Sequence, residues 1–130
     1  MSQDAVDLFW QVYNETTVEL LDDILAPTYV GHVNGRDIPG AAAAKTFISA
    51  FKSAFPDARF TIQDRIEAGD KVVTRWTATG THGGPFLGAE PSNRRINTQG
   101  ITIFQLAGGK ILELWGNWDV FGVMDQIGAD

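Results

Sequence analysis

Hydrophobic residues in the first part of the chain repeat at the spacing of an α-helix. Val6, Phe9 and Trp10 begin this pattern after Ser2 and Asp4, either of which is a suitable N-cap. The β-branched pair Thr16-Thr17 interrupts this pattern, and Pro27 and Pro56 end the second and third helical segments, since the residue before a proline disfavours the helical conformation. Three helices are therefore predicted, over residues 4–15, 18–25 and 39–55.

The remaining residues show a different pattern, with β-branched and aromatic residues alternating with polar ones. This period of two predicts four strands, over residues 58–67, 71–82, 94–107 and 110–120. Short glycine-containing connections near Gly69 and at Gly108-Gly109 are typical of antiparallel hairpins. Helices followed by strands predict an α+β fold, and a long twisted sheet that curls around its helices leaves a pocket at its open end.

Composition limits the protein class. The 130 residues have no internal repeat or linker, so we expect a single domain over residues 1–130. A net charge of −6 disfavours nucleic acid and anionic membranes as partners, and no apolar window is long enough to span a bilayer. Cysteine is absent, and "MSQDAVDLFW" lacks the pattern of a secretory signal, so we expect a cytoplasmic protein.

The segment "LWGNWDVFG" places one carboxylate, Asp119, among aromatic residues. By the period of a strand, Asp119 shares a face with Glu113, Trp115 and Asn117. An apolar wall raises the pKa of a carboxyl group and an amide can orient it, so this face suits general acid–base catalysis. The alternative is that Asp119 ends the strand and caps the following turn.

Four other polar residues have both a functional and a structural interpretation. His32 can face the mouth of the pocket or bond to a backbone carbonyl, and His82 can serve the site or the turn at Gly83-Gly84. Arg75 and Gln99 lie in strands, where they can line the cavity or pair on an exposed face. The sequence contains no nucleotide-binding loop and no metal-ligand spacing, so no cofactor or metal is expected.

The runs "VVTRWTATGTHGGPFLGAEPSNRRI" and "GITIFQLAGGKILELWGNWDVFGVMDQIG" resemble the SnoaL-like polyketide cyclase family, also called the ester cyclase family. The distinctive parts are the glycine-rich element after Gly80, the "GKILELW" strand, and Asp119 followed by a G-x-M-x-Q-I-G type sequence. The resemblance implies an NTF2-like cone, with three N-terminal helices packed on a strongly curved, mainly antiparallel sheet.

The resemblance also implies a cofactor-independent reaction in an apolar pocket. In this family an Asp matching Asp119 removes a carbon-bound proton for intramolecular aldol ring closure, and His32 is carried over as its helper. The expected ligand is a small, hydrophobic, aromatic or polyketide-like molecule. The residues expected to bind it are Trp115, Asn117, Trp76, Gln99, His82 and Arg75.

Other functions remain open, because NTF2-like cones serve many reactions. The first alternative is a noncatalytic small-molecule binding protein. Others are a hydroxylase partner, an isomerase, or an epoxide hydrolase, whose Asp, Asn and Arg set is only loosely imitated by Asp119, Asn117 and Arg75.

A homodimer is expected as well. Leu112, Leu114 and Trp118 share the other face of the last strand, where they would form an exposed apolar stripe unless a second copy covered them.

Overall fold

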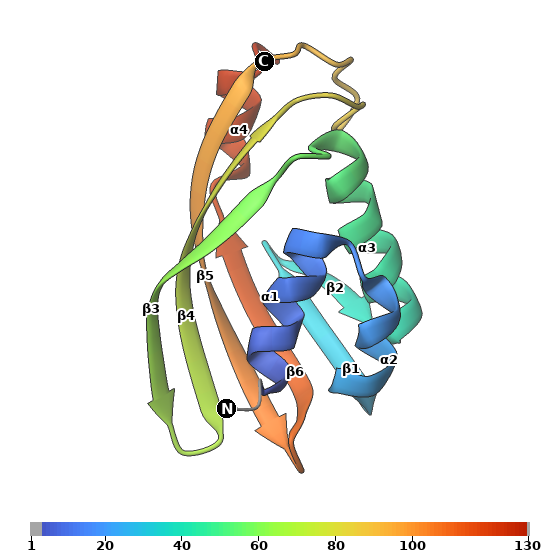
Figure 1. The fold of residues 1–130 in the computed structure, drawn as a ribbon, viewed down its shortest axis with the longest axis vertical. Helices are drawn as coiled ribbons and strands as arrows, with labels where there is room; N and C mark the ends of the chain where they lie inside the picture. The colour runs from blue at the N-terminus through green and yellow to red at the C-terminus, as the bar shows by residue number, and fades with distance from the viewer. Residues whose placement is uncertain (1–3, 130) are drawn as a thin grey trace.

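The computed structural model describes residues 4–129, which form one helical layer and one sheet (Figure 1). The helices are α1 (Ala5–Glu15), the short 3₁₀ helix η1 (Val18–Leu20), α2 (Leu21–Ile24), α3 (Gly40–Ala54) and α4 (Val120–Gln126). The strands are β1 (Leu25–Val33), β2 (Arg36–Pro39), β3 (Arg59–Ala68), β4 (Lys71–Thr81), β5 (Arg95–Ala107) and β6 (Lys110–Trp118). None of these described helices is both long and apolar enough to cross a membrane.

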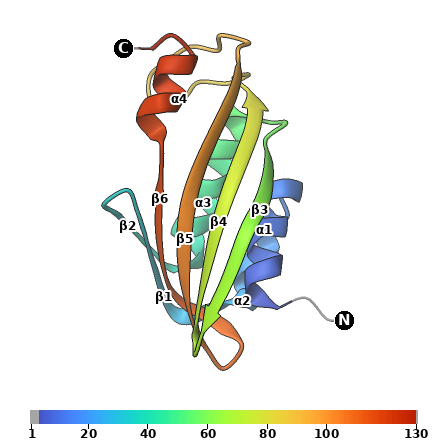
Figure 2. The same ribbon diagram turned by 90° about the vertical axis from the view of Figure 1, so that its left-hand side faces the viewer.

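The six strands form one sheet in the order β2-β1-β6-β5-β4-β3. All neighbours pair antiparallel except β1 and β6, which run parallel. Helices α1 and α3 cover one face of this sheet, and Figure 2 shows the opposite face of β3–β6 with no described helix laid across it. The predicted α+β fold, with N-terminal helices on a curved, mainly antiparallel sheet, is thus confirmed.

Three elements differ from the sequence prediction. The segment predicted as a loop after residue 25 contains β1 and β2, which form a hairpin around Asn34-Gly35. Both turn residues have positive φ, 49° and 81°, as a two-residue hairpin turn requires. Helix α4 lies where a turn was predicted. The second predicted helix, over residues 18–25, is present as η1 followed by α2. The Asn34-Gly35 turn is a local hairpin signal that the sequence prediction overlooked, whereas the pairing of β1 with β6, some 80 residues away, has no local signal.

Irregularities in the strand pairing accompany the curvature of the sheet. The register shifts between Ile62 and Asp64 in β3, and between Gln105 and Leu106 where β5 meets β6. An extra residue on one strand increases the local twist and bends the strand. The sheet therefore curls toward the helices and encloses an aromatic core, in which the rings of Phe9 and Phe104 meet edge to face at 5.2 Å.

Close packing of β4, β5 and β6 leaves no space for a side chain at Gly100. A Cβ atom there would overlap the Trp76 ring and lie 2.8 Å from both the Asn117 carbonyl oxygen and the Trp118 Cβ. The carbonyl oxygen and the Cβ atom can move only together with the backbone of β6. The absence of a side chain at Gly100 therefore allows the three strands to approach this closely.

We predict that Gly100→Ala lowers the free energy of unfolding by about 1–3 kcal/mol, the usual cost of overpacking. The matched control is Gly116→Ala, because the nearest atom to a Cβ there, Thr102 Oγ1, is 3.4 Å away. We expect the control to lower stability less than Gly100→Ala does, because its Cβ would make only van der Waals contact with a movable side chain. Urea unfolding of both variants measures the difference, and equal stability of the two would contradict the packing argument.

Candidate functional site

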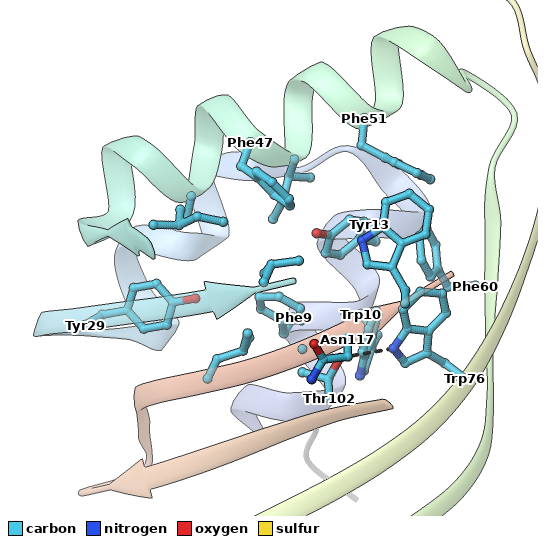
Figure 3. A pocket seen from close by; sticks show the side chains of 17 residues that line it. Phe9, Trp10, Tyr13, Tyr29, Phe47, Phe51, Phe60, Trp76, Thr102 and Asn117 are labelled. Carbon is cyan, nitrogen blue, oxygen red and sulfur yellow. Dashed lines mark hydrogen bonds between the residues drawn. The ribbon is translucent and has the colours of Figure 1, made fainter. Parts of the chain in front are cut away.

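A cavity lies between helices α1 and α3 and the inner face of the sheet (Figure 3). Its volume is about 60 Å³, and nine of its 17 lining residues are aromatic. The aromatic residues are Phe9, Trp10, Tyr13, Tyr29, Phe47, Phe51, Phe60, Trp76 and Trp118. None of the 17 lining residues carries a charge. The cavity therefore suits a flat, apolar molecule held by few polar contacts.

The polar groups of the cavity come from different elements. On the sheet side, the Trp76 indole Nε1 donates a hydrogen bond to Thr102 Oγ1 at 3.0 Å, so this donor is already engaged. The hydroxyls of Tyr13, from α1, and Tyr29, from β1, point into the cavity (Figure 3). Burial raises the pKa of both phenols, so both hydroxyls stay protonated at neutral pH.

The two faces of strand β6 are reversed from the prediction: the face expected to line the pocket is on the outer side of the sheet, and the face expected outside is on the inner side. Leu114 and Gly116 are buried beneath the helices, and Trp118 on the same parity lines the cavity. Trp115 instead faces an open groove on the outer side of the sheet. Alternation alone could not distinguish the faces because each carries a tryptophan. The predicted pocket wall at Trp115 and the predicted exposed stripe of Leu112, Leu114 and Trp118 are therefore wrong.

Asp119 lies outside the cavity. It is exposed, and its Oδ1 accepts a hydrogen bond from the Gly122 backbone N–H at 2.8 Å, which makes it the N-cap of α4. The expectation that this carboxylate is buried in the apolar cavity is wrong. The physical reason is that strand β6 ends at Trp118 and the first turn of α4 needs an acceptor for its free N–H groups.

The outer groove gathers most of the other predicted polar residues. Arg75, Gln99, Asn117 and Asp119 all line it together with Trp115. Arg75 pairs with Asp64 at 2.6 Å on this exposed face, so its structural interpretation is confirmed. Of the six residues expected to bind substrate, only Trp76 and Asn117 line the cavity, and Asn117 lines the groove as well.

The two histidines lie apart from the cavity. His82 is fully buried, and its Nδ1 accepts the Ser92 backbone N–H at 3.1 Å, which joins the end of β4 to the loop that follows. His32 lies on β1 opposite Trp115, on the outer side of the sheet. Because β1 turns Tyr29 and Val33 toward the cavity, His32 must point the other way. Its predicted position near the pocket is wrong.

No group of three or more histidine or acidic side chains converges within residues 4–129 in a way that could hold a metal ion. The site is thus best described as an aromatic cavity on one side of the sheet and a polar groove on the other.

Comparison with known proteins assigns the family. The model of the SnoaL-like polyketide cyclase family matches residues 3–127, almost the whole chain. This protein belongs to the SnoaL-like polyketide cyclase family. No curated protein matches its sequence significantly.

Solved structures share the fold of this SnoaL-like protein. TsrD from Streptomyces laurentii is 31% identical, with a TM-score of 0.86 and coverage of 97% of this chain and 93% of that one. IdmH from Streptomyces antibioticus, provisionally named a polyketide cyclase, is 27% identical, with a TM-score of 0.83 and 96% of each chain covered. AclR from Streptomyces galilaeus, provisionally named a hydroxylase, is 21% identical, with a TM-score of 0.82 over 92% of this chain and 89% of that one.

Neither tyrosine of the cavity was predicted from the sequence as a site residue. Tyr13 lies four residues after Phe9, on the apolar face of α1. A polar hydroxyl on this face could have been recognised from the sequence as a candidate site residue. Tyr29 could not be placed, because its strand was predicted as a loop.

His32 of this SnoaL-like protein bridges two carboxylates. Its Nδ1 lies 2.8 Å from Asp37 Oδ1 and its Nε2 lies 2.7 Å from Glu113 Oε2. Both neighbours are acceptors, so both ring nitrogens donate when the ring is an imidazolium. The hydrogen bonds to Asp37 and then Glu113 raise the pKa of His32 above its ordinary value. When its ring is protonated, this histidine links β1 to β2 and β6 by two charge-assisted hydrogen bonds.

We predict a pH-dependent stability contribution from His32. A raised folded-state pKa stabilises the protein fully below the unfolded value of about 6.5, and the stabilisation is lost as pH rises through the higher folded value. The melting temperature of His32→Gln should therefore fall furthest below that of the wild type at about pH 6, with a smaller gap at about pH 9.

Lys45→Gln is the control for this experiment. It removes an exposed ion pair, Lys45 to Asp22 at 2.7 Å, in which no imidazole takes part. Its effect on the melting temperature should stay constant between the two pH values. A constant gap for His32→Gln as well would contradict the imidazolium bridge.

Proposed function

We propose that this SnoaL-like protein binds a flat, apolar, carbonyl-bearing molecule in the cavity and closes a ring in it by intramolecular aldol chemistry without a cofactor. The observation that carries the proposal is the cavity itself, with nine aromatic walls and no charged lining residue, in a chain that belongs to a cyclase family. Such walls hold a folded polyketide-like chain by burial of apolar surface.

The ligand must enlarge the cavity. About 60 Å³ is well below the ~300–1,000 Å³ of sites that enclose drug-sized molecules. Phe47, Val33 and Trp118 line the cavity while remaining partly exposed, so they form its rim. We expect these rim side chains to turn aside when the ligand enters.

Asp119 is the proposed acid–base group, acting from the end of β6 on a part of the ligand that extends past Trp118, which borders both the cavity and the outer groove that Asp119 lines. It follows the cavity-lining Trp118 directly, and only its Oδ1 is engaged by the cap of α4. The carboxylate takes a proton from a carbon between two carbonyls, the enolate carbon bonds to another carbonyl carbon, and the protonated Asp119 returns its proton to the new alkoxide. Asp119 thus takes up one proton and returns it, so the reaction needs no second acid or base.

A noncatalytic binding protein is the second candidate. The observation that favours it is the position of Asp119, whose carboxylate caps a helix on the outer side of the sheet rather than facing the ligand cavity. In that case Asp119 has only the structural role of an N-cap.

The variant Asp119→Asn distinguishes the two functions. Asn caps a helix about as well as Asp, so the melting temperature should stay near that of the wild type in both cases. If Asp119 is the base, ring closure should fall by about 10²-fold or more. The measurement is the absorbance change of an aromatic β-ketoester whose second carbonyl lies within reach for ring closure.

Asp125→Asn is the matched control, because Asp125 is an exposed carboxylate on the same helix, α4. Its turnover should equal that of the wild type. Unchanged turnover of Asp119→Asn would eliminate Asp119 as the base, and binding of the ketoester without ring closure by the wild type would favour the binding protein.

We also propose that the protein forms a homodimer through the outer face of the sheet. Ile101 is 48% exposed there, and the partly buried Ile103 and Trp115 lie beside it in the groove. These residues replace the stripe on β6 predicted from the sequence. A sheet-to-sheet contact of two copies would bury the three side chains against their equivalents.

Ile101→Asp should convert this dimer to a monomer, since it places a charge at the centre of an apolar contact. Leu87→Asp is the control, because Leu87 is 67% exposed in the loop between β4 and β5, away from the sheet face. Sedimentation velocity at micromolar concentration should give a dimer for the control. A wild-type monomer would refute the proposal.

A further inference from the structure

A second hollow, the α1–β3 groove, lies between α1 and the edge strand β3 and shares a wall with the cavity. Its volume is about 290 Å³, and its lining comes from within residues 7–15 of α1 and residues 59–62 of β3. Trp10 and Phe60 line both the groove and the cavity. Their rings stack at 5.6 Å with an interplanar angle of 30°, so this aromatic pair is the wall that the two spaces share.

Phe60 is the fixed member of the shared wall. Its backbone N–H donates a hydrogen bond to Asn14 Oδ1 at 2.7 Å, and Asn14 Nδ2 donates one to the Phe60 carbonyl oxygen at 3.1 Å. One carboxamide thus satisfies both backbone groups that Phe60 presents at the edge of the sheet. The backbone that carries the Phe60 ring is therefore tied to α1.

Trp10 is the movable member of the shared wall. Its side chain is buried, yet its indole Nε1 has no hydrogen-bond partner among residues 4–129. A buried indole N–H usually has an acceptor, as Trp76, whose ring lies 5.6 Å from that of Trp10, has in Thr102 (Figure 3). Turning the Trp10 ring therefore breaks no hydrogen bond, and a position that gives its N–H an acceptor is favoured.

Opening this wall accounts for how a ligand larger than the cavity is accommodated. Alone, the cavity of about 60 Å³ is smaller than the sites that enclose drug-sized molecules. Joined to the groove of about 290 Å³, it reaches the ~300–1,000 Å³ of such sites. The joined site has an aromatic part beneath the helices and a polar part at the surface.

The α1–β3 groove offers hydrogen bonds of both kinds to a ligand. The Arg59 side chain donates, that of Glu15 accepts, and that of Gln11 does both. None of these three side chains makes a hydrogen bond or an ion pair with another residue in the described range 4–129. A hydroxyl group matches this mixture, since it donates and accepts, whereas an ionic group would be repelled by either the carboxylate or the guanidinium.

We infer that Trp10 turns to join the cavity and the α1–β3 groove, and that the joined site binds an amphipathic molecule with a flat apolar ring and an uncharged, hydroxyl-bearing arm. The ring lies in the cavity, and the arm lies in the groove, where Arg59 and Gln11 bind its oxygen atoms. The inference rests on the proposed function, because one part of the site is the proposed ligand cavity. The groove then selects the substituent of the ligand, since none of the residues that line the cavity is charged.

The test uses two probes with one ring system, 2-methoxynaphthalene and 3-(2-naphthyloxy)propane-1,2-diol, of which only the second has a hydroxyl-bearing arm. Dissociation constants are measured by titration of the full chain and followed by ¹H–¹⁵N chemical shifts. We expect Arg59→Met to weaken binding of the diol about tenfold or more, the usual effect of one lost hydrogen bond to a charged group. Binding of 2-methoxynaphthalene should be unchanged, because Arg59 lines the groove and not the cavity.

Arg95→Met is the matched control for the loss of an arginine. Arg95 is exposed, pairs with Asp57 at 3.2 Å, and lines neither the cavity nor the α1–β3 groove. Its substitution should leave the affinity for both probes at the wild-type value.

The movement of Trp10 is tested by its indole N–H signal, which is identified by its loss in Trp10→Phe. Binding of the diol to the wild type should shift this signal, and nuclear Overhauser effects should connect the protons of the arm with the Gln11 side-chain amide. The probe 2-methoxynaphthalene has no arm to place in the groove, so it should show no such effect at Gln11.

The outcomes separate the inference from the function on which it rests. Equal loss of both probes in Arg59→Met, or no loss of either, would overturn the joined site while leaving the cavity as the binding site. Overhauser effects from the arm to Phe47 or Val33, at the rim of the cavity, would do the same, as would a wild type that binds only 2-methoxynaphthalene. Failure of the wild type to bind either probe would overturn the ligand-binding function together with the inference.

Discussion

The arrangement of this protein depends on which face of the curved sheet is buried by α1 and α3. A sheet with helices on one side has one apolar face and one face in contact with solvent or a partner. Here the buried face carries Trp76, Thr102 and Leu114, and the same choice puts Trp115 on the outside. The cavity, the outer groove and the surroundings of every polar residue on β1 and β6 follow from it.

This choice also explains how a carboxylate is accommodated among the aromatic residues at the end of β6. Burying an unpaired charge costs several kcal/mol, and the structure avoids that cost by leaving Asp119 exposed as the cap of α4. A helix that begins directly after a strand needs an acceptor at this position. The helix cap is a sufficient structural reason for an acid here, so any catalytic role must be compatible with it.

The two sides of the sheet have contrasting chemistry. The inner cavity has hydroxyl and indole groups but no charged lining residue, whereas the outer side carries ion pairs such as Arg75 with Asp64 and the His32 bridge. A low-dielectric cavity strengthens each hydrogen bond that a ligand makes, while charged groups are less costly where water reaches them. The separation gives one sheet an apolar cavity on one side and a polar surface on the other.

The sequence by itself determined the fold class, the helices α1 and α3 and the four long strands, because periodicity and local turn residues act over short distances. The family was indicated separately, by the resemblance of its sequence motifs. Asp4 as a cap of α1 and the hairpins at Gly69 and Gly108 belong to the same local level. Only the tertiary structure decided the pairing of β1 with β6, which joins segments far apart in the chain. It also decided that Trp118 rather than Trp115 of β6 faces the cavity. Alternation makes the two faces of a strand differ, but only the packing of the helices determines which face is inside.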